Sequence, residues 1–225
     1  MTVGLMSLFR NSEHRLRKYF QQVLELRTQL KIRGDDLALI SIYGDCVDHT
    51  AAVLKSFGEK HRFMHTIREV NHGGPEYGST EAPERLKALT HVLNSGLEAL
   101  SERDSALIYV ESDLLWDAST WINLLGDLEP GYDVIAPLIF AGEYFYDVWG
   151  FRHLNGERFS PRWKGHGDGE LFEVGSVGSG FVMRGEVART CRVQNDYALV
   201  GWSDDVRTHG YRIWVDPTER ITHPA

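Results

Sequence analysis

Cysteine is scarce in this chain, and long apolar runs are absent. Only Cys46 and Cys191 occur among the 225 residues, too few for a disulfide framework and without the paired spacing of a zinc site. The apolar stretch at 2–9 is far shorter than the roughly 18 residues that a membrane span needs. It also lacks the basic region and cleavage site of a signal peptide. We therefore expect a protein of the reducing cytoplasm, without a membrane span.

Basic charge is also in deficit, since the formal net charge is -8. An acidic total argues against a surface that follows a nucleic-acid backbone. The chain has no G-x-x-x-x-G-K-[ST] loop, no G-x-S-x-G elbow and no H-E-x-x-H pair. It also has no G-x-G-x-x-G after its first apolar run. These absences disfavour P-loop enzymes, α/β-hydrolases, zinc metalloproteases and dinucleotide-binding oxidoreductases.

The length and composition that are present fit one α/β domain. Hydrophobic residues make up 42% and charged residues 25% of the chain, which are globular averages. A chain of 225 residues can bury a sizeable core but is too short for two generous domains and a linker. We therefore predict a single domain over 1–225.

Apolar segments alternate with helical patterns in the first half of the chain, which favours a parallel sheet. The stretch from 141 onward is instead aromatic, basic and glycine-rich, as binding regions often are. The segments at 180–188 and 211–217 supply two strands, or a strand and a short helix. The predicted strands before them lie at 2–9, 37–43, 61–70, 105–110 and 132–140, the predicted helices at 12–30, 50–57, 84–100 and 117–128, and a long loop at 71–83.

Two carboxylates end the buried strand at 105–110. Glu111 and Asp113 are two residues apart, so they project from the same face of an extended chain. Ligands bind at the carboxyl ends of strands in open parallel sheets, and paired carboxylates suit Mg²⁺ or Mn²⁺. Taken alone, such a pair more often ends a strand and caps the next helix.

Polar residues also end the first two predicted strands. Arg10 and Asn11 follow the first strand, and Asp45 follows the second, where a carboxylate can accept hydrogen bonds from a base or a ribose. Asp48 is placed to cap the next helix. Because the carboxyl ends of parallel strands share one edge of the sheet, these groups are expected to face one crevice together with the carboxylates after 105–110.

Seven segments, in this order, resemble a known family. The chain resembles nucleotide-sugar-dependent glycosyltransferases of the GT-A fold, and in detail is similar to the α-mannosyltransferase families of fungal mannan and capsule synthesis. The resemblance implies a GT-A (Rossmann-like), mostly parallel central sheet flanked by helices, with a nucleotide-binding half at 1–140 and an acceptor-binding, metal-completing half at 141–225. The matching segments are SLFRNSEHRLRKYF, SIYGDCVDHTAAVL, ERLKALTHVLNSGLEAL, IYVESDLLW, EYFYDVWGFRHLNG, VGSGFVMRGEV and SDDVRTHGYRIWVDP with a later histidine.

The resemblance also implies roles on the donor side. Glu111, Ser112 and Asp113 occupy the D-x-D position, with Glu in place of the first Asp. Asp113 is then a ligand of Mn²⁺ or Mg²⁺, while Glu111 faces the metal or the ribose. His223 falls where GT-A enzymes often carry a C-terminal metal-ligating histidine. The residues implied to hold the nucleoside are Arg10, Asn11 and Asp45, and those implied to lean toward the diphosphate or the sugar are Arg85 and Asn94.

The acceptor side is predicted from the aromatic half of the chain. Sugar faces stack on aromatic rings while charged groups bind hydroxyls, which favours a set of Tyr146, Asp147, Trp149 and Arg152. Asp204 and Asp205 fall where many GT-A enzymes have an acidic pair near the acceptor, and one of them would be the general base of an inverting reaction. Acceptor binding and helix capping are alternatives, because the mannosyltransferases are retaining enzymes that need no such base.

The predicted function is metal-dependent transfer of a sugar from a nucleoside-diphosphate sugar to a hydroxyl acceptor. The resemblance favours a GDP-mannose-like donor and retention of configuration. Its fungal members carry a membrane anchor that we do not find here, so a bacterial or phage enzyme of the cytoplasm is expected.

Two other interpretations remain open. One is a viral-type glycosyltransferase acting on hydroxymethylated bases in DNA, and the other is a non-catalytic module that binds a sugar or a nucleotide. DNA as an acceptor is favoured by a basic, aromatic stretch, which consists of Arg152, Arg158, Arg162, Trp163, Lys164 and His166.

Overall fold

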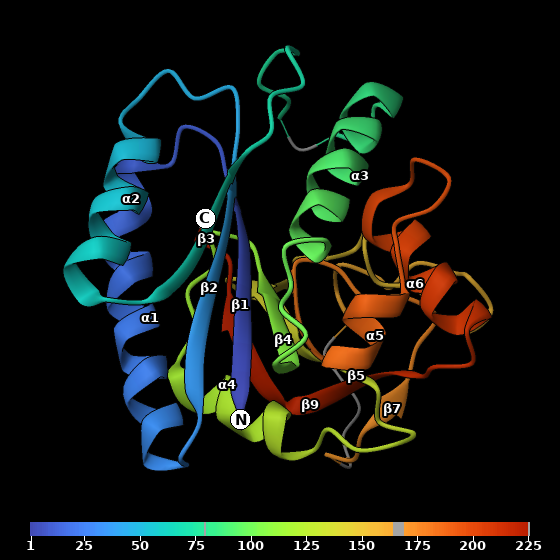
Figure 1. The fold of residues 1–225 in the computed structure, drawn as a ribbon. Helices are drawn as coiled ribbons and strands as arrows, with labels where there is room; N and C mark the ends of the chain where they lie inside the picture. Colours follow the sequence, from blue (N-terminus) through green and yellow to red (C-terminus); the bar gives the residue numbers. More distant parts are fainter. Residues whose placement is uncertain (79, 164–168, 225) are drawn as a thin grey trace.

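One mixed β-sheet runs through the centre of the molecule (Figure 1). The computed structural model describes residues 1–78, 80–163 and 169–224. Within these residues the sheet has nine strands in the order β3-β2-β1-β4-β8-β5-β9-β7, and β6 pairs with β5. The strands are β1 (Thr2–Phe9), β2 (Asp36–Tyr43), β3 (Met64–Glu69), β4 (Asp104–Val110), β5 (Val134–Ala141), β6 (Tyr144–Phe145), β7 (Phe172–Glu173), β8 (Gly180–Arg184) and β9 (Ile213–Thr222).

The strands of the first half are parallel to one another. β3, β2, β1 and β4 pair in parallel, and so do β5 and β9. β8 lies antiparallel between β4 and β5. The carboxyl ends of β1, β2 and β4 therefore meet at one edge of the sheet, as predicted, and the mostly parallel α/β fold is confirmed.

Helices cover both faces of the sheet (Figure 1). Alternate residues of the central strands face opposite layers, so Leu5 and Ile108 pack with α1, α2 and α4, whereas Met6 and Tyr109 pack with α3, α5 and α6. Each face of the sheet thus has its own apolar core. The helices are α1 (Glu13–Ile32), α2 (Thr50–His61), α3 (Pro83–Leu97), α4 (Ala118–Gly126), α5 (Gly185–Thr190) and α6 (Ala198–Thr208).

The first turns of α1 and α2 are joined at the edge where β1 and β2 end. The Asp48 carboxylate accepts hydrogen bonds from the backbone N–H groups of Glu13 and Thr50, both at 3.0 Å. The Glu13 carboxylate accepts in turn from the N–H of His49 at 3.0 Å. Free N–H groups of two helices are satisfied in this way. The predicted capping role of Asp48 is observed, and it extends to a second helix.

A helix that the sequence did not predict lies between the last two apolar segments. α6 carries Trp202, which is buried and stacks on Phe181 of β8 with ring centroids 4.7 Å apart. The apolar segment at 180–188 divides into β8 and α5. Within the described residues, no helix combines the length and the apolar character that crossing a bilayer requires.

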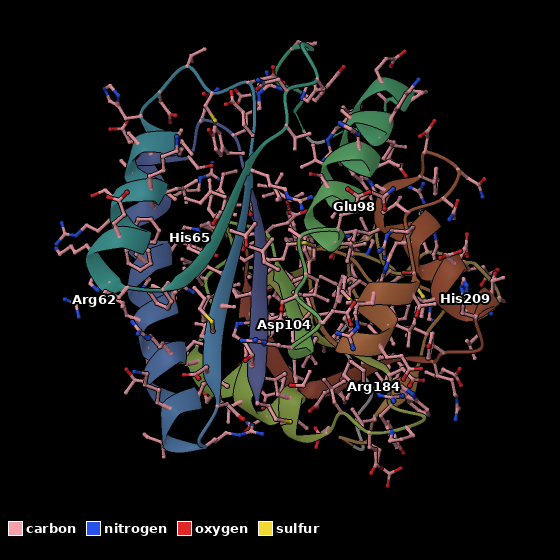
Figure 2. The ribbon with its side chains drawn as sticks, viewed as in Figure 1. Arg62, His65, Glu98, Asp104, Arg184 and His209 are labelled. Carbon is pink, nitrogen blue, oxygen red and sulfur yellow. The ribbon has the colours of Figure 1, made fainter. Side chains whose placement is uncertain are left out.

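A partly buried histidine packs between α2 and the outer strands (Figure 2). His65 of β3 lies 2.9 Å from the Ser41 hydroxyl through Nε2, while its buried Nδ1 has no hydrogen-bond partner among the described residues. Gly58 of α2 lies so close to the ring that a Cβ there would collide with it. Burial lowers the pKa of His65 from 6.5 to about 4, so the ring is neutral at pH 7.

Candidate functional site

Two adjoining cavities open at the carboxyl ends of β1 and β4. The first, here called the β1–β4 cavity, has a volume of about 280 Å³ and lies between those strand ends, the 72–77 segment and α3. The second, the β6–α6 cavity, has a volume of about 290 Å³ and is lined by the segments after β6 and before α6. Arg85, Leu89 and Glu111 line both cavities. Glu111 and Arg85 therefore mark the junction between two binding spaces.

Glu111 carries an altered proton affinity at this junction. Its backbone N–H donates to the carbonyl of Ser179 at 2.9 Å, which holds it against the segment before β8. Desolvation, followed by the negative charges of Asp113 and Asp147, raises the pKa of Glu111 to about 8, and Arg85 opposes this shift. Desolvation and like charges both disfavour ionisation. The Glu111 carboxyl is therefore mostly protonated at pH 7.

Asp113 and His223 come together from distant parts of the chain. The Oδ2 atom of Asp113 lies 3.7 Å from Nε2 of His223 and 3.3 Å from a guanidinium nitrogen of Arg15. The His223 ring stacks on Tyr146 with centroids 3.9 Å apart. The backbone N–H of His223 donates to the carbonyl of Phe140 at 2.8 Å. Backbone and ring contacts thus fix the imidazole beside the carboxylate.

Asp113 and His223 together are suited to bind a divalent cation. The Oδ1 atom of Asp113 is buried and has no hydrogen-bond partner among the described residues. A buried carboxylate oxygen without a partner is costly unless a ligand satisfies it. A carboxylate oxygen beside an imidazole nitrogen suits Mn²⁺. Glu111 does not join Asp113 and His223 in a group whose ligand atoms all lie within 4.8 Å, as far as the described residues go.

Asp147 is buried in the wall of the β6–α6 cavity. Its carboxylate accepts a hydrogen bond from the N–H of Ser179, and burial raises the pKa of Asp147 against these hydrogen bonds. Gly178 contacts this carboxylate so closely that a Cβ would overlap both of its oxygens. The glycine in the VGSGF segment therefore makes room for Asp147.

The other predicted acceptor residues divide between the cavity and the core. Tyr146 and Trp149 line the β6–α6 cavity, together with Tyr197. Arg152 is buried and donates hydrogen bonds to the carbonyls of Val148 and Phe151 at 3.2 and 3.1 Å. Burial raises the pKa of the nearby Asp147 carboxyl, and the positive charge of Arg152 opposes this rise. Arg152 does not line the cavity itself.

The residues predicted to hold the nucleoside form hydrogen bonds to a loop. The Arg10 guanidinium lines the β1–β4 cavity and donates to the carbonyls of Gly74 and Pro75 at 2.9 and 2.8 Å. Asp45 accepts from the N–H of His72 at 2.9 Å, and this hydrogen bond is the main cause of its lowered pKa.

Asn11 and Asp45 both have the left-handed backbone, with φ of 45° and 49°. Asn11 accepts from the N–H of Val47 and donates to Glu76, both at 2.9 Å. Asp45 lines a neighbouring hollow with Asp48. Arg10, Asn11 and Asp45 thus fix the 72–76 segment over the β1–β4 cavity.

The D-x-D serine and Arg85 also lie at the cavities. Ser112 is buried and lines the β1–β4 cavity beside Asp113. The Arg85 guanidinium donates to the carbonyl of Thr80 at 3.0 Å. Both residues therefore line the cavity, and their contact with a donor stays a prediction.

Besides Asn11, Asp45, Arg152 and His223, whose contacts are given above, three more predicted site residues line neither cavity within the part of the chain that the structure describes. The Asn94 side-chain amide forms two hydrogen bonds with the backbone of Val193. It accepts from the N–H of Val193 at 2.8 Å and donates to the carbonyl of Val193 at 3.1 Å. Asp204 is exposed on α6. The Asp205 carboxylate accepts from the N–H of Arg192 at 2.9 Å. The observed partners of these residues are structural ones.

The stretch predicted to favour DNA does not form a basic surface in its described part. Arg158 pairs with both carboxylate oxygens of Glu81 at 2.7 and 2.9 Å. Trp163 packs edge-on against Phe145 and Phe159, and Arg152 is buried. Arg162 is exposed, and Lys164 and His166 lie outside the described residues.

Sequence reasoning missed several residues that line the cavities. Arg15 lies in the first turn of α1 and contacts Asp113, and Tyr197 precedes α6. His72 and Tyr77 line the β1–β4 cavity with their rings 6.1 Å apart. The sequence predicts a long loop at 71–83, but the position of this loop at the cavity depends on contacts with Arg10 and Asp45.

A family model described as Cryptococcal mannosyltransferase 1 matches residues 2–180. No curated protein has a matching sequence. The similarity to fungal capsule mannosyltransferases that the motifs indicated is therefore confirmed.

The solved structures with this fold include a mannosyltransferase and S. aureus TarS. The mannosyltransferase PcManGT from Pyrobaculum calidifontis, in complex with GDP-Man and Mn²⁺, has a TM-score of 0.63 at 14% identity, over 98% of this chain and 56% of that chain. S. aureus TarS 1-349 has a TM-score of 0.58 at 12% identity, over 100% of this chain and 60% of that chain. Its complex with UDP has a TM-score of 0.59 at 10% identity, over 100% and 61%. The chain thus spans less than two thirds of these proteins, and the similarity establishes the GT-A fold.

Proposed function

Because the chain belongs to the cryptococcal mannosyltransferase 1 family, we propose that it transfers a sugar from a nucleoside-diphosphate sugar to a hydroxyl acceptor. The donor is GDP-mannose or a close relative, and the transfer retains the anomeric configuration. One observation carries the proposal: Asp113, whose buried Oδ1 has no hydrogen-bond partner among the described residues, lines the β1–β4 cavity and lies 3.7 Å from His223. The complex of PcManGT with GDP-Man and Mn²⁺ supports the choice of donor.

The β1–β4 cavity suits the nucleoside diphosphate. His72 and Tyr77 offer ring faces on which a base can stack. Arg15 and Arg85 line the same cavity, and their guanidinium groups can bind phosphate oxygens. Two arginines thus line the cavity proposed for the diphosphate, although the net charge of the chain is -8.

Asp113 and His223 would hold Mn²⁺ or Mg²⁺, with Glu111 at the neighbouring position. A divalent cation in this place neutralises charge on the departing diphosphate. Stacking on Tyr146 keeps the His223 ring in one orientation, and Arg15 limits the freedom of the Asp113 carboxylate. The protein thereby holds both groups in place before the donor binds.

The β6–α6 cavity suits the transferred sugar and the acceptor. Tyr146, Trp149 and Tyr197 present aromatic surface, on which the C–H faces of sugars pack. Asp147 and Glu111 supply carboxyl oxygens for hydroxyl groups. The exposed position of Asp204 and the pairing of Asp205 with Arg192 agree with a retaining reaction that needs no base there.

Ligand-dependent stability tests the proposal directly. A panel of GDP-, UDP- and CDP-sugars is added to the protein with and without Mn²⁺, and the melting temperature is measured. GDP-mannose at 100 times its dissociation constant should stabilise the fold by about 2.7 kcal/mol. Asp113→Asn should remove the part that depends on Mn²⁺, whereas Asp36→Asn, an exposed aspartate at the start of β2, should retain it.

Turnover then separates an enzyme from a binding module. Release of GDP from GDP-mannose in the presence of Mn²⁺ would establish catalysis. If no nucleotide sugar stabilises the wild-type protein with Mn²⁺ present, the proposal is wrong.

A further inference from the structure

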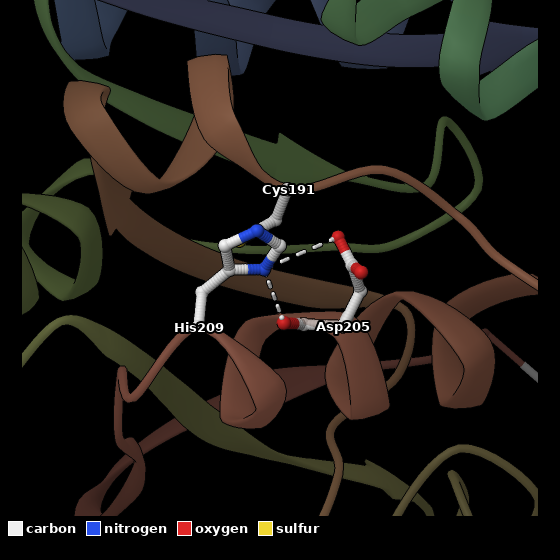
Figure 3. A group of neighbouring side chains, drawn as sticks. All are labelled: Cys191, Asp205 and His209. Carbon is white, nitrogen blue, oxygen red and sulfur yellow. Dashed lines mark hydrogen bonds and ion pairs between the residues drawn. The ribbon is translucent and has the colours of Figure 1, made fainter.

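A second group of metal-ligand side chains lies outside both cavities. Cys191 follows α5, Asp205 belongs to α6 and His209 caps the end of α6. One ligand atom of each residue lies within 4.8 Å of the other two, and no other trio of this kind occurs in the described part of the chain. Figure 3 shows the His209 ring directed into the space between Cys191 and Asp205.

We propose that Cys191, Asp205 and His209 bind a zinc ion. Zinc is held by thiolate, imidazole and carboxylate ligands in tetrahedral sites, and a site with three protein ligands takes water as the fourth. The hard ions Mg²⁺ and Mn²⁺ prefer oxygen ligands. The thiol therefore makes this site selective for a different ion from the one proposed at Asp113.

The histidine is already oriented by a hydrogen bond. Nδ1 of His209 lies 2.9 Å from the backbone carbonyl of Asp205, and that carbonyl can only accept a hydrogen bond. The Nδ1–H therefore donates to it, and the lone pair of the neutral ring is on Nε2. Metal-ligating histidines generally donate their second ring N–H to a carbonyl or a carboxylate in this way.

The carboxylate is also held in place. Oδ2 of Asp205 accepts the N–H of Arg192 at 2.9 Å and lies 3.7 Å from Nδ1 of His209. The carboxylate therefore stays beside Cys191 without contacting solvent freely. Hydrogen-bonded carboxylates of this kind are usual among metal ligands.

The charges of the group balance around a divalent ion. Cys191 is fully buried, and a carboxylate oxygen of Asp205 lies within 4.8 Å of its sulfur. A thiolate without a metal would therefore be unfavourable there. A zinc ion replaces the thiol proton, which leaves to solvent. The thiolate, the Asp205 carboxylate and Zn²⁺ together carry no net charge, so the buried site avoids the cost of an isolated ion.

The ion would fix the wall of the β6–α6 cavity. The chain between Cys191 and Asp205 contains Tyr197 and Ala198, which line that cavity. This chain also contains non-glycine residues with left-handed backbone at Asn195, Asp196 and Ala198, with φ of 60°, 49° and 48°. A link from Cys191 to α6 would hold this strained segment in place. The inference concerns a structural metal, and it does not require the proposed transferase activity.

Cobalt binding tests the proposal with the whole chain. Co²⁺ takes the place of Zn²⁺ in tetrahedral sites and gives a thiolate charge-transfer band only when a cysteine is a ligand. We expect the metal-free protein to develop this band on titration with Co²⁺ and to lose it when Zn²⁺ is added. Cys191→Ser should abolish the band. Cys46→Ser changes the second cysteine of the chain, which is half-buried, and should leave the band intact.

Two further variants distinguish zinc binding at this site from metal binding at Asp113 and from a loss of folding. His209 has a side chain that is 42% exposed, so His209→Gln should fold normally while its affinity for Zn²⁺ falls by more than about tenfold. Asp113→Asn should leave the cobalt band unchanged. Absence of the band in the wild type, or its loss in Cys46→Ser instead of Cys191→Ser, would overturn the proposal. So would unchanged zinc affinity in folded His209→Gln.

Discussion

Nε2 of His223 lies 3.7 Å from Oδ2 of Asp113, although one residue follows β4 and the other follows β9, the last strand of the chain. The sheet brings them together. Leu115, two residues after Asp113, forms an antiparallel bridge with Thr222, the residue before His223. The bridge has two hydrogen bonds of 2.8 Å. Backbone pairing therefore sets the separation of the two side chains, and their geometry does not depend on a ligand.

Removal of the imidazole should weaken binding of Mn²⁺. His223→Ala removes one of the two groups at the proposed metal site, so we expect the dissociation constant of Mn²⁺ to rise by at least about tenfold. Calorimetric titration with Mn²⁺ measures this. His91→Ala, at an exposed histidine on α3, is the matched control. Equal affinity in His223→Ala and wild type would exclude His223 as a ligand.

The strand ends were predictable from the sequence because apolar runs that stop at polar residues report where a parallel sheet ends. Asp113 and Arg10 were found in this way. The proximity of His223 rested on a family resemblance, since no local pattern reveals the Leu115–Thr222 bridge.

Contacts between distant segments explain what sequence reasoning missed. Asn94 was predicted to face the donor, but its amide pairs with the backbone of Val193. The cluster of Cys191 with Asp205 and His209 also escaped notice, because its spacing matches no zinc motif and α6 was not predicted. Residue spacing along the chain carries no information about such pairings.

Neutralising the junction carboxyl should stabilise the protein at alkaline pH. The pKa of Glu111 is about 8 in the folded protein, against 4.5 for the free side chain in the unfolded chain. The folded state therefore binds more protons between these values, and the free energy of unfolding falls as pH rises from about 4.5 to 8. In Glu111→Gln this loss disappears, and we expect the variant to be more stable than the wild type at pH 8 by about 4 kcal/mol.

Urea unfolding at pH 5 and pH 8 measures this difference. Glu102→Gln, at an exposed glutamate, should keep the pH dependence of the wild type. A Glu111→Gln variant that is less stable than wild type at pH 8 would contradict the assigned cause. Transferase activity should fall in the same variant, since the proposed sugar contact at the junction of the cavities is altered.

Protonation of His65 should destabilise the protein in weak acid. Its pKa is about 4 in the folded protein against 6.5 for the free side chain, so the unfolded chain binds more protons between these values. Stability is therefore lost as pH falls from 6.5 toward 4. His65→Gln should remove about 2 kcal/mol of this loss, as measured by urea unfolding at pH 7 and pH 4.5. His91→Gln should behave as wild type, and an unchanged acid dependence in His65→Gln would rule out His65 as its source.

Asn94 should contribute to stability and not to donor binding. Asn94→Ala removes two hydrogen bonds to Val193 and leaves its backbone groups without these partners. We expect a loss of about 1–3 kcal/mol of unfolding free energy with an unchanged dissociation constant for GDP-mannose. Asn123→Ala, which removes an exposed contact with Glu219, should cost less. If donor affinity falls in Asn94→Ala while stability is retained, the predicted donor role is correct instead.

A single methyl group at Gly178 should distort the acceptor side. The Cβ of Gly178→Ala would overlap the Asp147 carboxylate, which is buried in the wall of the β6–α6 cavity. We expect a destabilisation of about 1–3 kcal/mol from this overpacking and a higher KM for the acceptor, because Asp147 must move.

Gly126→Ala is the control, since a Cβ there meets no atom within 4 Å and its φ is not positive. At the end of α4 this change should be neutral or stabilise by up to about 1 kcal/mol. Asp147→Ala in the Gly178→Ala background removes the clash, and it should recover stability if contact with Asp147 is the cause. A double variant less stable than Gly178→Ala would show that the glycine is required by some other contact.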